Sequence, residues 1–177
     1  LTTKQIFIFF SVCFVSFGLL LIFLTSFAGR DDAGTVFKGA VQFNAGNFSL
    51  IKPGAYFYRY PHQLGLLSFE RLVLYLIPLP VISVFYVLNL GMVIGMNYAT
   101  WKITEELFQR PLVSRTAVIM SFGFLPLVFN IMFAYGLMYG LFFSSFAILF
   151  FLRYLRRGKA RNAFLSVVML SLAYWVR

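Results

Sequence analysis

Long apolar runs, separated by short polar intervals, make up most of this chain. A helix rises about 1.5 Å per residue, so about 20 apolar residues cross the hydrocarbon core of a bilayer. The pattern therefore predicts an all-α, polytopic membrane protein with a single transmembrane domain over residues 1–177. The predicted spans cover residues 6–28, 81–103, 117–134, 137–152 and 163–176.

The first apolar run has a second interpretation as a secretory signal, with Lys4 as its basic start and a cleavage site after Ala28. A signal has an apolar core of about 7–15 residues, whereas this run is free of charge from residue 6 to residue 28. We therefore expect an uncleaved helix.

A polar outer loop, predicted over residues 29–80, separates the first two spans. Apolar residues recur at helical spacing from Val36 to Phe43, which predicts a short amphipathic helix on the membrane surface that ends near Gly46. From residue 48 to residue 60 we expect a loop, because turn-forming residues gather there.

A second short apolar stretch follows at residues 64–77, and Pro61 suits the first turn of a helix. Glu70 and Arg71 interrupt this stretch, and about 14 residues are few for a span. We therefore predict another surface helix rather than a crossing of the membrane.

The distribution of basic residues predicts the orientation. The formal net charge is +10, and the basic residues fall mainly between apolar runs, which favours topology signals over a nucleic-acid groove. Nine basic residues would be cytoplasmic and six external, so we expect a multi-pass protein of the cell membrane with a cytoplasmic amino terminus and an extracytoplasmic loop 29–80. The cytoplasmic set is Lys4, Lys102, Arg110, Arg115, Arg153, Arg156, Arg157, Lys159 and Arg161. The external set is Arg30, Lys38, Lys52, Arg59, Arg71 and Arg177.

Composition agrees with a bilayer as the solvent of this chain. It is 61% hydrophobic and 11% charged, against about 45–50% and 25% in soluble domains. The one cysteine, Cys13, cannot form an intrachain disulfide. Because the chain begins with Leu1 and ends at Arg177 directly after an apolar run, we expect a fragment of a larger protein that is inactive in isolation.

The five acidic residues limit where a general base can lie. Glu105 and Glu106 fall on the cytoplasmic side, beside Lys102 and Arg110, where we expect solvated charges at a helix end.

On the external side, a base must come from the Asp31–Asp32 pair, Glu70 or His62. We expect Glu70 to be tied to the adjacent Arg71 on a surface helix. An aspartate before a helix also serves as an N-cap, so the pair has a structural interpretation as well.

Other kinds of site find little support. Tyr56, Tyr58 and Tyr60 are typical of an interfacial aromatic belt, although tyrosines also stack on sugar rings. One histidine and one cysteine cannot build a typical zinc site, so no metal site is predicted. No Walker, Rossmann or serine-centred motif is present.

Four stretches carry a resemblance to a known family. They are Asp32 with Ala40 eight residues on, the Ala-Gly-Asn-Phe of residues 45–48, the aromatic segment of residues 56–65, and the Ala-Tyr-Gly-Leu-Met-Tyr-Gly of residues 134–140. Together they resemble the amino-terminal part of GT-C membrane glycosyltransferases, most closely glycosyltransferase family 39, with protein O-mannosyltransferases and lipid A aminoarabinose transferases as relatives. The resemblance covers most of this chain and about a third of a complete enzyme.

The resemblance implies an inverting transfer of a sugar from a polyprenyl-phosphate donor to an acceptor hydroxyl on a protein, glycan or lipid, at the extracytoplasmic face. It assigns the general base to Asp32, and cations would neutralise the lipid phosphate. No cofactor is required, and a divalent metal is left open. Ala33 replaces a second acid of many relatives, so we expect acceptor handling to differ. The substrate-binding residues implied are Asp31, Lys38, Tyr58, Arg59, Tyr60, His62, Gln63 and Arg177.

Two other classes stay open: another lipid-linked transferase or polymerase, and a non-catalytic membrane scaffold or transporter fragment. A transporter places charged or broken-helix sites near the middle of the bilayer. The polar or helix-bending residues within these spans are Asn89, Asn97, Asn130 and Pro126. A scaffold would tolerate replacement of Asp32 and Arg59.

Overall fold

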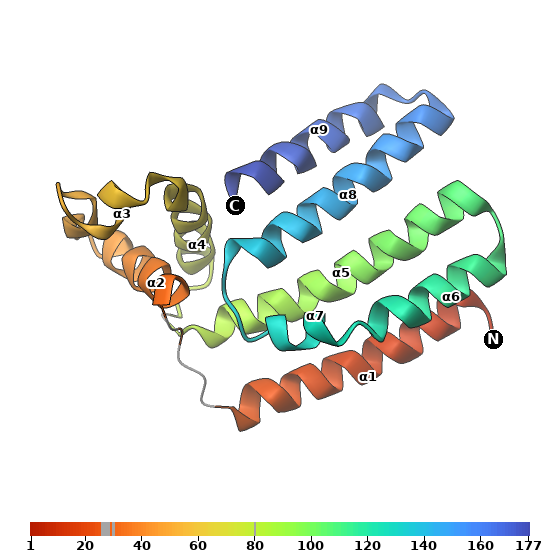
Figure 1. Ribbon diagram of the computed structural model, residues 1–177, viewed down its shortest axis with the longest axis horizontal. Coiled ribbons are helices and arrows are strands. Elements are labelled where there is room, and N and C mark those ends of the chain that lie inside the picture. The colour runs from red at the N-terminus through yellow and green to blue at the C-terminus, as the bar shows by residue number, and fades with distance from the viewer. Residues whose placement is uncertain (26–28, 30, 80) are drawn as a thin grey trace.

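The structure is a computed structural model that describes residues 1–25, 29, 31–79 and 81–177. Within these residues the regular elements are all helical (Figure 1), as the sequence predicts. The predicted end of the first span at Ala28, as well as Arg30 and Pro80, lies outside the described residues. The elements are α1 (Thr3–Leu24), α2 (Asp31–Asn44), η1 (Ser49–Ile51), α3 (Tyr56–Arg59), η2 (Pro61–Gln63), α4 (Leu64–Leu76), α5 (Ser83–Phe108), α6 (Pro111–Phe122), α7 (Leu125–Asn130), α8 (Gly136–Arg157) and α9 (Ala160–Trp175).

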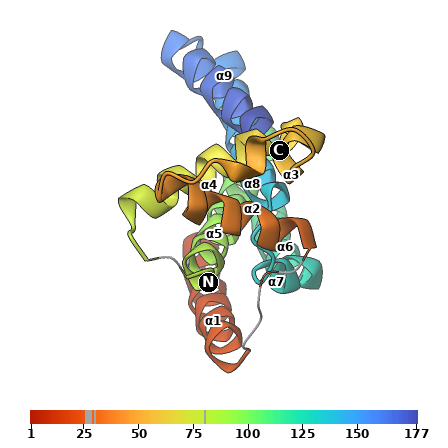
Figure 2. The ribbon, with the colours of Figure 1, turned by 90° about the vertical axis from the view of Figure 1, so that its left-hand side faces the viewer.

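The helices form two parts, which we call the bundle (α1 and α5–α9) and the cap (α2–α4 with η1 and η2). Figure 1 shows α1, α6, α5, α8 and α9 side by side, and Figure 2 shows the cap lying across one end of them. Helices α1, α6 and α9 run toward the cap, whereas α5 and α8 run away from it.

Two helices in the described part of the chain are long and apolar enough to cross a membrane. Helix α1 has 22 residues with a mean hydropathy of 2.8, and α8 has 22 residues with a mean hydropathy of 1.6. Thr2 caps α1 by accepting a hydrogen bond from the Gln5 amide at 3.2 Å, while the Gln5 side chain accepts one from the Thr2 amide at 2.8 Å.

The stretch predicted as one span over residues 117–134, bent at Pro126, is instead two helices. Helix α6 ends at Phe122, and α7 begins at Leu125 with Pro126 in its first turn. Since a proline lacks the amide that a helix interior needs, it is best accommodated in a first turn. The interval between the predicted spans 81–103 and 117–134 is also mostly helical, because α5 continues to Phe108 and α6 begins at Pro111.

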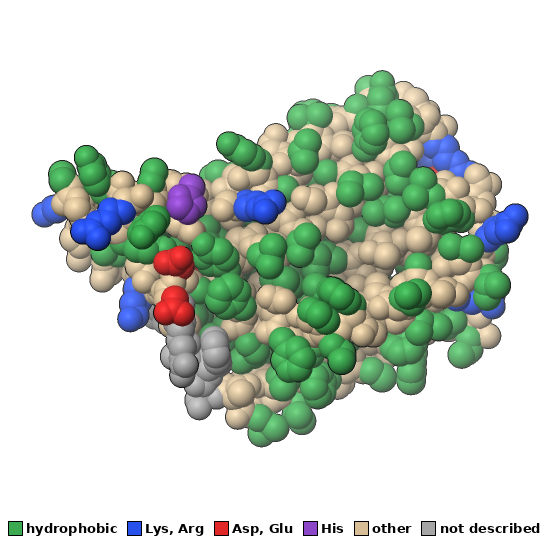
Figure 3. Space-filling view, viewed as in Figure 1, with side chains coloured by type: hydrophobic (Ala, Val, Ile, Leu, Met, Phe, Trp, Pro, Cys, Tyr) green, Lys and Arg blue, Asp and Glu red, His purple; other side chains and the backbone are tan. Residues whose placement is uncertain are grey.

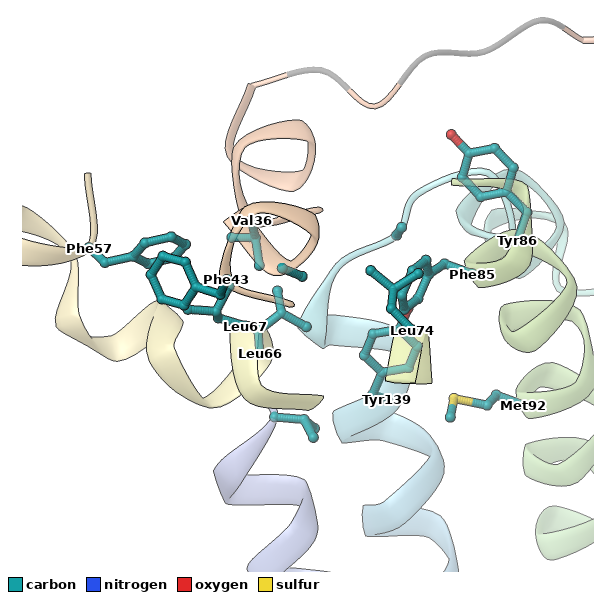
Figure 4. Packing of buried hydrophobic residues seen from close by; sticks show 13 residues of the cluster. Val36, Phe43, Phe57, Leu66, Leu67, Leu74, Phe85, Tyr86, Met92 and Tyr139 are labelled. Atoms are coloured by element: carbon teal, nitrogen blue, oxygen red, sulfur yellow. The ribbon is translucent and has the colours of Figure 1, made fainter. Parts of the chain in front are cut away.

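Helix α2 has the predicted amphipathic pattern, but its apolar face packs inside the cap instead of lying free for a membrane. Val36 and Ala40 are fully buried, and the Phe43 ring packs edge-on against Phe57 at 5.7 Å. Figure 4 shows this group of side chains between α2, α3 and α4. The prediction of a plain loop over residues 48–60 is therefore wrong, since the burial of Phe57 stabilises a short helix there.

Helix α4 packs with one side on α2 and with the other on the bundle. Leu74 lies beside Phe85 and Tyr139 in Figure 4, so α4 joins the cap and one end of the bundle in a single core. The carbonyl of Trp175, in the last turn of α9, lies so close to Gly65 that a Cβ there would overlap it. Glycine thus permits the close packing of α9 on α4.

The other end of the bundle holds an ion cluster. Glu106 on α5 accepts hydrogen bonds from three arginines of α8: Arg153 at 3.4 Å, Arg156 at 3.0 Å and Arg157 at 2.8 Å. Its side chain is only 8% exposed, so the prediction of a solvated charge is wrong for Glu106. Burial would raise the pKa of this carboxyl, but the three arginines lower it.

Candidate functional site

Asp31 and Asp32 form the first turn of α2, where the helix meets the bundle. Both are exposed, and negative charge at a helix amino end is favourable. Asp31 has a left-handed backbone with φ of 50°, which aspartate tolerates better than most residues. Figure 3 shows acidic side chains (red) on the same face as the histidine (purple).

Only Asp32 lies in line with the buried face of α2. Val36, Gly39 and Phe43 follow it at helical spacing, and all three are buried inside the cap. A Cβ on Gly39 would lie 2.6 Å from the Phe57 ring, so α3 rests directly on this stripe. Asp32 is therefore the exposed end of a buried stripe that faces α3.

The Tyr56 hydroxyl of α3 is buried and faces the Asp32 carboxylate. Burial, and next the proximity of Asp32, raise the pKa of Tyr56. Tyr135 and Tyr60 contribute to this environment with smaller electrostatic effects. In the described part of the chain, no hydrogen bond of standard geometry involves this hydroxyl. It is thus a donor held next to Asp32 and not committed to another protein group.

A chain of contacts links Tyr56 to the bundle. The Tyr56 and Tyr60 rings lie 5.0 Å apart, and the Tyr60 and His62 rings lie 6.1 Å apart. The Gln63 amide lies 3.3 Å from His62 Nε2 and donates to the hydroxyl of Tyr135, just before α8. Since Gln63 is only 3% exposed, this bond joins cap and bundle in a dry place.

Among the predicted site residues, the structure thus brings together Asp32, Tyr60, His62 and Gln63, with Asp31 at their edge. Tyr56 and Tyr135 were not predicted as site residues. A tyrosine between a short loop and a predicted span was the available signal for Tyr135, but nothing in the sequence indicates its contact with Gln63.

The remaining predicted residues lie apart from these contacts. Lys38, Tyr58 and Arg59 are exposed on the cap, and among the described residues none of them has an ion pair. Arg177 is exposed at the end of α9, where it lines a cavity of about 230 Å³ between α8 and α9.

Glu70 does not have the place predicted for it. It is fully buried, and the adjacent Arg71 turns away to donate to the Asn44 carboxamide oxygen at 3.1 Å. The helical period separates two neighbours in sequence by about 100°, so Arg71 points to α2 while Glu70 points into the core.

An exposed carboxylate beside a tyrosine can accept a proton, and the histidine and glutamine farther along this chain of contacts can hold a polar ligand by hydrogen bonds. Over the described residues, no three His, Cys, Asp or Glu side chains converge as a metal site would require. The chain matches no model of a known protein family, and no curated protein or solved structure matches it.

Proposed function

We propose that this chain is part of a membrane glycosyltransferase that moves a sugar from a polyprenyl-phosphate donor to an acceptor hydroxyl on the extracytoplasmic face, with Asp32 as general base. The observation that carries the proposal is the position of Asp32. Its carboxylate is exposed, yet it adjoins Tyr56 in a set of polar contacts that connects the cap with the bundle. This arrangement supports the role that the family resemblance implies for Asp32.

The distribution of charge supports the proposed orientation. Figure 3 shows several Lys and Arg side chains (blue) at the end of the bundle away from the cap. This end holds the basic residues of the α8–α9 connection and the arginines around Glu106. With that end in the cytoplasm and α1 and α8 as spans, the cap and Asp32 face the outside.

An apolar cavity near the start of α2 supports a lipid-linked donor. Its volume is about 660 Å³. It opens between three elements, which are the end of α4, the first turns of α5 and Phe142 of α8. A Cβ on Gly29 would overlap the Ile82 side chain, so Gly29 lies against the residue that precedes α5, between the cavity-lining Val81 and Ser83. The lining includes Val73, Ile77, Val84, Leu88, Met92 and Phe142.

The proposed reaction is a single displacement at the anomeric carbon. As the acceptor oxygen bonds to this carbon, its proton passes to the Asp32 carboxylate. The bond between the carbon and the phosphate oxygen breaks, and polyprenyl phosphate leaves with the electron pair. Arg59, Lys38 and Arg177 are the cations proposed to stabilise the phosphate. The tyrosines provide faces for sugar rings.

The test compares Asp32→Asn with Asp31→Asn in the natural protein, in membranes at matched protein levels. Transfer from a polyprenyl-phosphate sugar should fall about 10²–10⁴-fold for Asp32→Asn, the usual contribution of a positioned base. It should fall far less for Asp31→Asn, which lies outside the stripe that faces α3. Near-normal transfer by both variants would mean that this loop is not the catalytic centre, and loss in Asp31→Asn alone would move the base by one residue.

A further inference from the structure

Of the acidic and basic residues in the described part of the chain, Glu70 is the most deeply buried. It is 0% exposed, and neither of its carboxyl oxygens has a hydrogen-bond partner among the described residues. Leu66 and Leu67 lie one turn before it on α4, and Leu74 lies one turn after it, all of them buried. The carboxyl group therefore sits within the apolar contact between cap and bundle.

A tyrosine of the bundle interacts with Glu70. Tyr139 on α8 is also 0% exposed, interacts electrostatically with Glu70, and packs its ring on Phe69 at 4.7 Å. Its hydroxyl has no partner of standard hydrogen-bond geometry within the described chain. The contact between cap and bundle thus buries two polar groups, the Glu70 carboxyl from the cap and the Tyr139 hydroxyl from the bundle.

Among the described residues, no cation lies against Glu70 from the helices around it. On its own helix, Arg71 bonds to Asn44 of α2 and Tyr75 is exposed. The charged residues of α2 are Asp31, Asp32 and Lys38, all exposed, and Arg177 after α9 is exposed too. From α5, the titratable group in this core is Tyr86. An ionised Glu70 would therefore be a buried charge without compensation.

Such a charge costs far more than a buried neutral acid, so the group keeps its proton. Burial accordingly raises the pKa of Glu70 well above the ordinary range of a carboxyl. If the cap separates from the bundle, the carboxyl meets water and its pKa returns to about 4.3.

We propose that Glu70 is a proton-controlled latch between cap and bundle: with its proton bound, α4 packs on α5 and α8, and loss of the proton releases the cap. The docked state binds the proton more tightly than the open state. Docking is therefore strongest at a pH below the pKa that Glu70 has in the open state. It weakens as the pH rises from there toward the higher pKa that Glu70 has in the docked state. A single proton changes the equilibrium about tenfold per pH unit in this interval.

The latch controls the assembly of the candidate site. Gln63, at the start of α4, reaches Tyr135 only when α4 is docked. Release of the cap would part Asp32 and Tyr56, which belong to the cap, from Tyr135, which belongs to the bundle. The latch itself is a property of the fold and is measured without any activity.

The test follows the exposure of a buried cysteine in the full chain. In a Cys13→Ser background, Leu66→Cys places a thiol on the buried face of α4, where the leucine is 1% exposed. The rate of maleimide labelling is measured from pH 6 to pH 8, once with Glu70 and once with Glu70→Gln. The ratio of the two rates cancels the intrinsic pH dependence of the thiol.

The ratio should rise with pH, by up to about tenfold per pH unit. A cysteine at Val118 in the bundle core, which is 0% exposed, is the control, and its ratio should stay constant. A constant ratio at position 66, or an equal rise at position 118, would overturn the latch. If Glu70→Gln does not accumulate, Glu70→Leu replaces it as the reference, with the same two decisive outcomes.

Discussion

The two ends of the bundle each bury one glutamate, in opposite surroundings. At the cap end, Glu70 is completely buried among apolar side chains, with no cation beside it in the described structure. At the other end, the side chain of Glu106 is 8% exposed and contacts three arginines within 3.4 Å. One carboxyl is neutralised by a proton and the other by cations, so the pKa of Glu70 is raised while that of Glu106 is lowered.

The difference shows that the residues next to a glutamate in the sequence do not determine which group it pairs with. Glu70 precedes an arginine, yet Arg71 bonds to Asn44. Glu106 follows another acid, yet its partners lie 47 to 51 residues away on α8. In each case the packing of α4 or α5 on a distant helix selects the partner.

The largest expected difference between the two ends is their side of the membrane. In a Cys13→Ser background, single cysteines at Asn47 in the cap and at Lys159 after α8 are treated with an impermeant maleimide on intact cells. Because the basic residues gather at the end away from the cap, only the cysteine at Asn47 should react. Lys159→Cys should react after the cells are opened. Reaction of both from outside would disprove the orientation.

The next largest difference is expected in how much stability the protein loses when each carboxyl is removed. Glu106→Ala leaves three arginines facing one another, and should cost about 2–4 kcal/mol of the free energy of unfolding. Glu70→Leu replaces a neutral acid with an apolar group of similar size, and should cost less than about 1 kcal/mol or stabilise the fold. Unfolding in detergent as a function of denaturant measures both. Equal losses in the two variants would mean that Glu70 has a charged partner.

A smaller effect is expected from the glycine contact at the cap end. Gly65→Ala places a methyl group against the carbonyl of Trp175, and should destabilise the protein by about 1–3 kcal/mol. Gly91→Ala on α5 is the matched control, since a Cβ there meets nothing within 4 Å. Alanine favours a helix more than glycine does, so the control should gain up to about 1 kcal/mol. Thermal unfolding in detergent distinguishes the two results.

The sequence predicts the elements whose signals are local. The long apolar runs of α1 and α8, and the helical spacing in α2, depend on residues within one helix. The continuation of α5 to Phe108 was missed because the predicted span ended at residue 103, where the apolar run gives way to polar residues. In the structure Glu105 is supported within the helix, where it accepts hydrogen bonds from Trp101 at 2.6 Å and Lys102 at 2.8 Å.

The candidate site was predicted only in part for the same reason. Asp32, His62 and Gln63 could be proposed because they lie in one polar interval. The approach of Tyr135 depends on a bond across 72 positions of the chain, and the burial of Glu70 depends on α5 and α8. Neither has a signal in the residues next to it.

Helix α4 packs both on α2 and on the bundle, which has a consequence for folding during synthesis. Gln63 and its partner Tyr135 are 72 residues apart, and a ribosome adds about 5–20 residues per second. For roughly 4–14 s, the newly made α4 therefore lacks Tyr135 and the surface of α8 on which it packs. During that time Glu70 is in water and ionised at neutral pH, so it must take up a proton when the last helices arrive.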